Sequence, residues 1–353
     1  MTASNLAIGS IAPQTYQGIY VRNNLVAQGT VPEQPPFNLC PDIIHSDSQV
    51  PANTFATPAS WQQMYSTDPI IGAQNFYYVR GKNGASAPDT GTMALYWAPA
   101  QVFNFPAAWK GNALTTLSGG ESSAVSASGG NIAVGDEPFV WTPASVPFGS
   151  SYFNFVCQSV DRANPNPIPT IGSWLDLSNL LSNKPGFGFR NTAVVDGAAP
   201  SWMHRQMLSV PANFSPAQLQ LVLSAQGFTG TTVGLLCDMF TPSGQVIAID
   251  PVNVVGDGII VGTTATMEPG YQTSLAIVCW NPSGSLSPGS SLTLSMTYAV
   301  QTGADLEFAM TNGLLRYQHE QGIGSSRIGP TPVATVASIT FMVGAQLQSA
   351  LHR

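Results

Sequence analysis

Five aromatic residues are concentrated in one short stretch of the chain, YWAPAQVFNFPAAWKG. Aromatic rings stack on sugars or fill a pocket on a protein partner, and Trp and Tyr contribute strongly to the energy of interfaces. The same rings at the end of a strand can instead close the end of a β-sandwich core. The sequence therefore offers two interpretations, a ligand- or partner-binding cluster and a core cluster. The residues concerned are Tyr96, Trp97, Phe103, Phe105 and Trp109.

Residues that commonly serve catalysis are few in this chain and lie far apart. The His319–Glu320 pair lacks the second histidine that a zinc protease carries four residues away. The glycines of residues 256–262 lack the spacing of a dinucleotide-binding loop. We therefore expect no cofactor and no enzyme activity, although three histidines meeting in space would favour a metal or catalytic site. The histidines are His45, His204, His319 and His352.

The acidic residues and cysteines form no metal-binding pattern either. Two acidic groups, Asp42 with Asp47 and Asp136 with Glu137, lack the dense ligand spacing of a calcium loop, and we expect them to be solvated at the surface. The cysteines contain no CxxC pair, and three of them lie in strand-like runs, which indicates structural thiols, with disulfides or ligands as the alternative. The cysteines are Cys40, Cys157, Cys237 and Cys279.

Charged side chains are scarce, at 8% of 353 residues, against about 25% in ordinary soluble proteins. In their place the chain has 34 Gly and 28 Pro, which excludes long amphipathic helices and favours many short strands with turns between them. Sparse charge also weakens the repulsion that keeps molecules apart, so we expect self-association. The net charge of −7 and the lack of any basic patch exclude nucleic acid and anionic lipid as partners.

The sequence carries no recognisable targeting or membrane segment. Its first residues, MTASNLAIGSIAPQTYQG, have neither the charged region nor the sustained apolar region of a secretory signal. No run approaches the roughly 18 apolar residues that cross a bilayer. We expect synthesis in the cytoplasm without a cleavable signal, and the final location stays open, export included.

Short strands must position the aromatic cluster. Residues 1–40 contain two short β-prone pieces around a Pro-rich stretch, which predicts an extended arm that packs on its own domain or adds a strand to a neighbour. From residue 41 to 170, strand-like runs follow one another with turns between them. In residues 151–161, SYFNFVCQSVD continues this pattern with Phe153, Phe155 and Cys157 on one face. A period of two over several such runs is typical of a β-sandwich.

The second half of the chain repeats this pattern after a Pro-rich segment, Asp161–Gly172, which predicts a stiff linker. One helix is predicted next, capped by Ser173, with Asp176 in the capping-box position and an end at Pro185–Gly186. Residues 171–353 predict a second, jelly-roll-like antiparallel sandwich. It contains a hairpin around the turn sequence TPSG, and its last segment, 331–353, docks in cis or on a partner.

The first domain resembles a known family. The segments CPDII, NFYYVRGKNGASAPDTGTMALYWAP, FPAAWKG and VWTPASVPFGSSYFNFVCQSVD, followed by NKPGFGFRNTAVVD, are similar to bacterial proteins with a CARDB-like, immunoglobulin-like domain over about residues 40–196. The chain has Tyr152–Phe153 where the family often has His before Cys, and it has no partner cysteine for an antibody-type disulfide. The resemblance implies an immunoglobulin-like first sandwich in an adhesive, structural or surface-presentation module, with no catalytic residues.

Together these features predict a non-enzymatic structural protein. We expect it to assemble with copies of itself, or with partner proteins, into a filament, tube, shell or appendage, because it combines sparse charge with strand-rich, arm-flanked domains. The alternative is a glycan- or receptor-binding module, such as a lectin or a bacterial toxin component, with the aromatic cluster Trp97–Trp109 as its binding surface.

Overall fold

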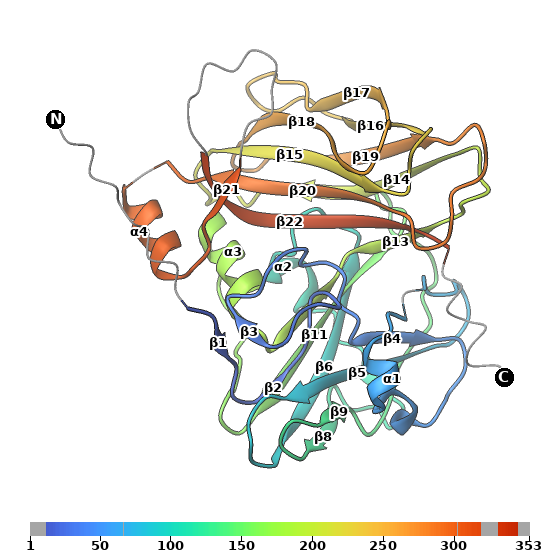
Figure 1. The fold of residues 1–353 in the computed structure, drawn as a ribbon, viewed down its shortest axis with the longest axis vertical. Coiled ribbons are helices and arrows are strands. Elements are labelled where there is room, and N and C mark those ends of the chain that lie inside the picture. Colours follow the sequence, from blue (N-terminus) through green and yellow to red (C-terminus); the bar gives the residue numbers. More distant parts are fainter. Residues whose placement is uncertain (1–11, 66, 302, 319–330, 345–353) are drawn as a thin grey trace.

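The computed structural model describes residues 12–65, 67–301, 303–318 and 331–344 of the chain. Strands dominate it and form two β-sandwiches, one in the lower half of Figure 1 and one in the upper half, with helix α3 (Trp174–Asn183) between them. This arrangement confirms the predicted all-β class. In the described ranges, no helix has the length and apolar character needed to cross a membrane.

The first sandwich consists of a six-stranded sheet that faces a four-stranded sheet. In the larger sheet, β5 pairs antiparallel with four other strands. In the smaller sheet, β11 pairs with β6 from Phe153↔Pro99 to Asp161↔Gly91, and their alternate residues fill the core between the sheets. The larger sheet contains β2 (Ile19–Tyr20), β4 (Ile43–Ser46), β5 (Asn75–Asn83), β7 (Thr115–Thr116), β9 (Ile132–Val134) and β10 (Phe139–Trp141). The smaller sheet contains β6 (Asp89–Pro99), β8 (Ser123–Ala127), β11 (Phe153–Asp161) and β12 (Phe187–Arg190).

The N-terminal segment packs on its own sandwich from residue 12 onward. Strands β1 (Gln14–Thr15) and β3 (Thr30–Val31) pair with each other, and β2 joins the edge of the larger sheet through β5. The Tyr20 side chain is buried, and the backbone N–H of residue 21 donates to the carbonyl of Pro185 at 2.8 Å. The described part of the arm therefore packs on its own sandwich, which is one of the two predicted positions. Residues 1–11 lie outside the described residues.

The second sandwich also pairs a larger sheet with a four-stranded one. In the larger sheet β22 lies between β13 and β20, parallel to the former and antiparallel to the latter. β19 and β20 follow one another along the chain but lie in opposite sheets, so the loop between them crosses from one layer to the other. The larger sheet contains β13 (Thr192–Val195), β15 (Ala217–Gln226), β18 (Gly258–Met267), β20 (Ser291–Ala299), β21 (Arg316–Gln318) and β22 (Thr331–Val343). The smaller sheet contains β14 (Ser201–Ser209), β16 (Thr232–Cys237), β17 (Ala248–Asn253) and β19 (Gln272–Trp280).

Helix α3 begins and ends where the sequence predicts. The Ser173 hydroxyl accepts a hydrogen bond from the Asp176 N–H at 3.1 Å and caps the helix. The Asp176 carboxylate accepts from the Gly172 N–H at 3.1 Å, so it binds one residue before the position that a capping box requires. The other described helical segments are η1 (Ala52–Phe55), α1 (Pro58–Trp61), α2 (Pro106–Trp109) and α4 (Gly303–Thr311).

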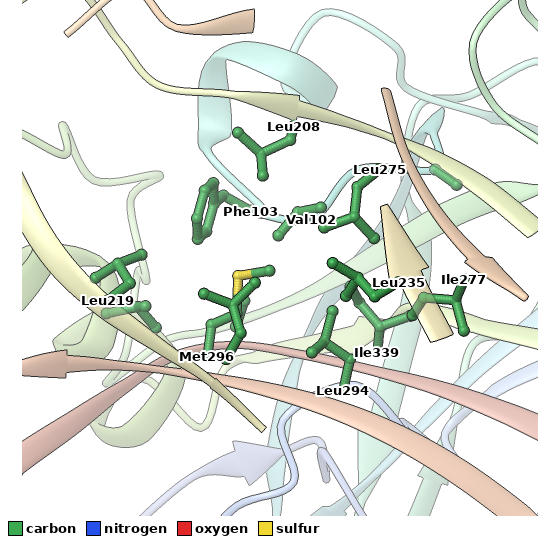
Figure 2. Close-up of a cluster of buried hydrophobic side chains, with 14 of the residues drawn as sticks. Val102, Phe103, Leu208, Leu219, Leu235, Leu275, Ile277, Leu294, Met296 and Ile339 are labelled. Carbon is green, nitrogen blue, oxygen red and sulfur yellow. The ribbon is translucent and has the colours of Figure 1, made fainter. Parts of the chain in front are cut away.

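The hydrophobic core of the second sandwich extends across the junction to the first, because the segment after β6 inserts into the second sandwich. The core between the two sheets of the first sandwich is a separate cluster. Figure 2 shows Val102 and Phe103 among side chains of the upper sandwich, including Leu208 and Met296. The backbone of this segment also runs along the edge of β14: the Val102 N–H donates to the Met207 carbonyl and the Met207 N–H to the Ala100 carbonyl, each at 2.8 Å. The first sandwich therefore extends a sheet of the second.

Polar contacts add to this junction. The Asn38 side-chain amide donates to the Thr340 hydroxyl at 2.9 Å and to the Asn191 carbonyl at 3.0 Å, so the N-terminal segment is bonded to β22. The chain passes from the first sandwich to the second between β12 and β13, since β12 pairs with β11 and β13 pairs with β22. The predicted boundary at residue 170 consequently falls in the loop before α3, and the last strand of the first sandwich follows it.

Candidate functional site: an exposed apolar sheet face

Three of the five predicted aromatic site residues are buried. The exposed fractions of Phe103, Phe105 and Trp109 are 1%, 7% and 1%. The Phe103 ring lies 4.9 Å from the Trp174 ring, and the Phe105 ring lies 5.2 Å from that of Phe214, measured between centroids. A ring without exposed surface cannot stack on an incoming ligand. We therefore correct the assignment of these three residues as binding residues. They pack in the hydrophobic core, as the core interpretation of the cluster expects.

The other two aromatic residues, Tyr96 and Trp97, are half-buried on opposite faces of β6. The Tyr96 ring lies 5.1 Å from the Trp109 ring, and its hydroxyl donates to Gln158 Oε1 at 2.9 Å. The Trp97 ring lies 5.0 Å from the Trp141 ring inside the first sandwich. The five rings therefore do not form one common surface, and a shared ligand-binding role for them stays a prediction without geometric support.

The two described histidines lie in different sandwiches, His45 in β4 and His204 in β14. His45 Nε2 lies 2.8 Å from Asn75 Oδ1, and His204 packs against the rings of Trp202 and Phe341. Burial lowers the pKa of each imidazole to about 4, so both are neutral at pH 7. His319 and His352 lie outside the described residues.

Asp42, which we expected at the surface, is fully buried between two arginines. Its carboxylate accepts from Arg22 Nη2 at 2.6 Å and from Arg80 Nε at 2.9 Å. The Arg22 guanidinium also lies over the Trp61 ring, 3.3 Å from its centroid. The expectation was wrong because strand spacing does not show that two distant arginines converge on this loop. The three charges have no exposed surface, so the group ties the N-terminal segment to β5 and offers no ligand site.

A second buried acid lies in the same segment. The Glu33 carboxylate accepts from the backbone N–H of Asn23 and from its side-chain amide, each at 2.9 Å. Burial raises the pKa of this carboxyl to about 8, and the bonds from Asn23 oppose the shift only in part. No cluster of three or more His, Cys, Asp or Glu suited to a metal ion occurs in the described parts of the chain. The four cysteines are buried free thiols, as the structural interpretation predicts.

The strongest surface feature is the outer face of the sheet β14-β19-β16-β17. Its register places Met203 opposite Val278, and Leu236 opposite Ala276, on the side that faces away from the core. Met203, Leu236 and Trp280 are 50%, 51% and 43% exposed. We call this surface the apolar face, made of Met203, Gly234, Leu236, Ala276, Val278 and Trp280.

The residues of the apolar face carry no charge. At its centre Gly234 has no side chain, and Ala276 is 4% exposed, with Arg205 opposite it in the register. An ion pair between Arg205 and Asp238 crosses it, and these two charges neutralise one another. Met239 and Phe240, in the loop after β16, extend the exposed apolar surface with 61% and 67% of their area accessible.

Sequence reasoning missed this surface, although β19 carried a signal for it. Its run LAIVCW, residues 275–280, has apolar residues at every position and so does not alternate. In a sheet with one face in the core, such a run places apolar side chains on both faces.

Comparisons with known proteins give no family for this chain. No family model matches, and no curated protein matches. Among solved structures, a family 123 glycoside hydrolase from Clostridium perfringens is 12% identical, with 50% of this chain and 26% of that chain covered and a TM-score of 0.18. This chain thus spans about a quarter of that hydrolase.

Two adhesins are also among the similar structures. The collagen adhesin of S. aureus is 8% identical, with 77% of this chain and 88% of that chain covered and a TM-score of 0.22. The adhesive subunit CfaE of the CFA/I fimbria of enterotoxigenic Escherichia coli is 11% identical, with coverages of 95% and 96% and a TM-score of 0.18. TM-scores this low support no transfer of activity or partner from these proteins.

Proposed function

We propose that this chain is a non-enzymatic structural protein that assembles with copies of itself through the second sandwich. The observation that carries the proposal is the apolar face, where Met203, Leu236 and Trp280 are each about half exposed on one side of a single sheet. Monomeric proteins rarely expose contiguous apolar patches larger than a few hundred Å². Burying such side chains in a contact contributes about 25 cal/mol per Å² of apolar area.

The distribution of charge supports the same function. Charged residues make up 8% of the chain, and the apolar face carries the neutral pair Arg205–Asp238. Two such faces carry no net charge and therefore add no repulsion of their own when they approach. The glycan-binding alternative loses its main support, because Phe103, Phe105 and Trp109 are buried in the core.

Light scattering of the purified protein over a hundredfold range of concentration tests the proposal. We expect species larger than the 37.1 kDa monomer whose fraction grows with concentration. Leu236→Lys places a charge in the centre of the apolar face and should weaken association at least tenfold. Val26→Lys is the matched control, because Val26 is 77% exposed on the first sandwich. A wild-type protein that stays monomeric at every concentration would overturn the proposed function.

A further inference from the structure

Strand β18 forms one edge of the second sandwich, and neither a charge nor a proline protects this edge against pairing. β18 is the outermost strand of its sheet, and its ten residues, GIIVGTTATM, contain no charge and no proline. By contrast, the edge of β14 is covered by residues 100–102, and the edge strand β17 contains Asp250 and Pro251. Natural sheets protect edges by such means, because exposed N–H and C=O groups pair readily with another strand.

Hydrogen bonds from the Gln245 side chain show which backbone groups of β18 point away from the sheet. Gln245 Nε2 donates to the Thr264 carbonyl at 3.1 Å, and Gln245 Oε1 accepts from the Thr266 N–H at 3.0 Å. Because successive residues of a strand direct their backbone groups to opposite sides, Gly262, Thr264 and Thr266 all point away from β15. The Gln245 amide thus occupies two of these groups in the way a neighbouring strand would, and within the described residues no strand pairs with this edge.

We propose that β18 pairs antiparallel with β18 of a second copy about a two-fold axis, with Thr264 of each copy at the centre of the register. In this register Thr264 faces Thr264, and Gly262 faces Thr266 of the other chain, so all three outward residues find a partner. The pairing exchanges about six backbone hydrogen bonds, which outnumber the two that Gln245 makes on each edge. The proposal rests on the self-assembly proposed above and names one of its contacts.

A second copy is the partner because the edge is complementary to itself. A strand of basic or acidic character would gain nothing from an edge without charge, whereas two identical uncharged edges meet without repulsion. Exposed apolar side chains flank the edge as well: Ile259 is 72% exposed and Val246, next to Gln245, is 54% exposed. In Figure 1, β17 and β18 lie at the top of the molecule, at the far side of the second sandwich from the first.

This edge and the apolar face are different surfaces, which determines the form of the assembly. A single two-fold contact closes as a dimer, whereas two different two-fold contacts on each copy propagate into a larger object. Blocking one contact should therefore leave dimers held by the other, and blocking both should leave monomers.

Variants of Thr264 test the proposal by light scattering. Thr264→Pro removes an outward N–H that makes no bond within the sandwich, so the edge strand tolerates it while strand addition is blocked. We expect this variant and Leu236→Lys each to stop at dimers, and the double variant to be monomeric. Thr264→Val retains the N–H and should assemble like the wild type. Gln245→Ala removes the competing amide and should strengthen association at least threefold.

Amide hydrogen exchange of the unaltered protein gives an independent measurement. The amides of residues 262 and 264 should exchange at least tenfold more slowly under assembling conditions than in dilute solution. An assembled wild type that shows no such protection, or a folded Thr264→Pro variant that assembles like the wild type, would overturn the β18 contact and leave the proposed function standing. A strictly monomeric wild type would overturn both.

Discussion

Truncation of Phe103 provides a stringent test of the core that extends across the junction. Phe103 belongs to the segment that follows β6, and its side chain is 1% exposed. It packs among side chains of the second sandwich, including Leu208 and Met296 (Figure 2). It also contacts Trp174 of α3 edge-to-face, with ring centroids 4.9 Å apart. Phe103→Ala therefore removes contacts with both sandwiches and with the helix between them.

The expected loss is large. Replacing a buried Phe by Ala typically costs about 3–5 kcal/mol, through lost transfer energy and the cavity that stays behind. The rigid surroundings of two sheets and a helix limit collapse of this cavity, so we expect a value in the upper half of that range. Since folded domains are stable by about 5–15 kcal/mol, the variant should lose a substantial part of its stability.

Equilibrium unfolding in urea, followed by circular dichroism and tryptophan fluorescence, measures this loss. The matched control is Phe148→Ala, which makes the same chemical change at a side chain that is fully exposed, and it should shift the free energy of unfolding by less than about 0.5 kcal/mol. If Phe103→Ala were no more destabilising than this control, the insertion of the segment into the second core would be refuted.

Three further predictions concern buried ionisable groups. Asp42→Asn leaves the Arg22 and Arg80 guanidinium groups buried without a counter-charge and should cost about 3–5 kcal/mol in the same unfolding experiment. The folded-state pKa of Glu33 is raised to about 8 from 4.5, so the folded protein keeps this proton to higher pH than the unfolded chain does. The stability of the wild type should therefore fall as pH rises from about 4.5 to 8, and Glu33→Gln should lack that fall. The folded-state pKa of His204 is lowered to about 4 from 6.5, so the unfolded chain binds a proton at a higher pH than the folded protein does. Stability should therefore fall as pH drops from about 6.5 to 4, and His204→Phe should reduce this fall.

Exposed residues of the same type supply the controls. Asp47→Asn and Glu121→Gln change exposed carboxylates, and both should leave the free energy of unfolding and its pH dependence nearly unchanged. Equal effects of Asp47→Asn and Asp42→Asn would contradict the role given to the buried ion group. A Glu33→Gln variant with the wild-type pH profile would contradict the raised pKa.

Local patterns in the sequence were sufficient to predict the strands and the best-defined helix. Alternation in residues 152–161 placed Phe153, Phe155 and Cys157 in one core, and the structure buries all three. Ser173 marked the start of α3, because a hydroxyl before an apolar run satisfies a free N–H of the first turn. The turn sequence TPSG lies between β16 and β17, which pair antiparallel as predicted.

Long-range pairing was not accessible in the same way. Nothing in the period of two shows that β19 and β20 enter opposite sheets, or that β12 returns to the first sandwich after α3. The convergence of Arg22 and Arg80 on Asp42 likewise depends on contacts between distant segments. The aromatic cluster was recognised, but its location depends on where the chain leads after β6, and only the three-dimensional structure gives that path.

The position of β22 has a consequence for how this protein is made. It fills the slot between β13 and β20, yet it follows both of them, and every other strand of its sheet, in the order of synthesis. The ribosome therefore synthesises β13 and β20 before the strand that joins them, and translation must reach about residue 343 before the gap between them can close. Until then the other strands of this sheet lack their pairing with β22, and unpaired strand edges of this kind make a nascent chain prone to aggregation.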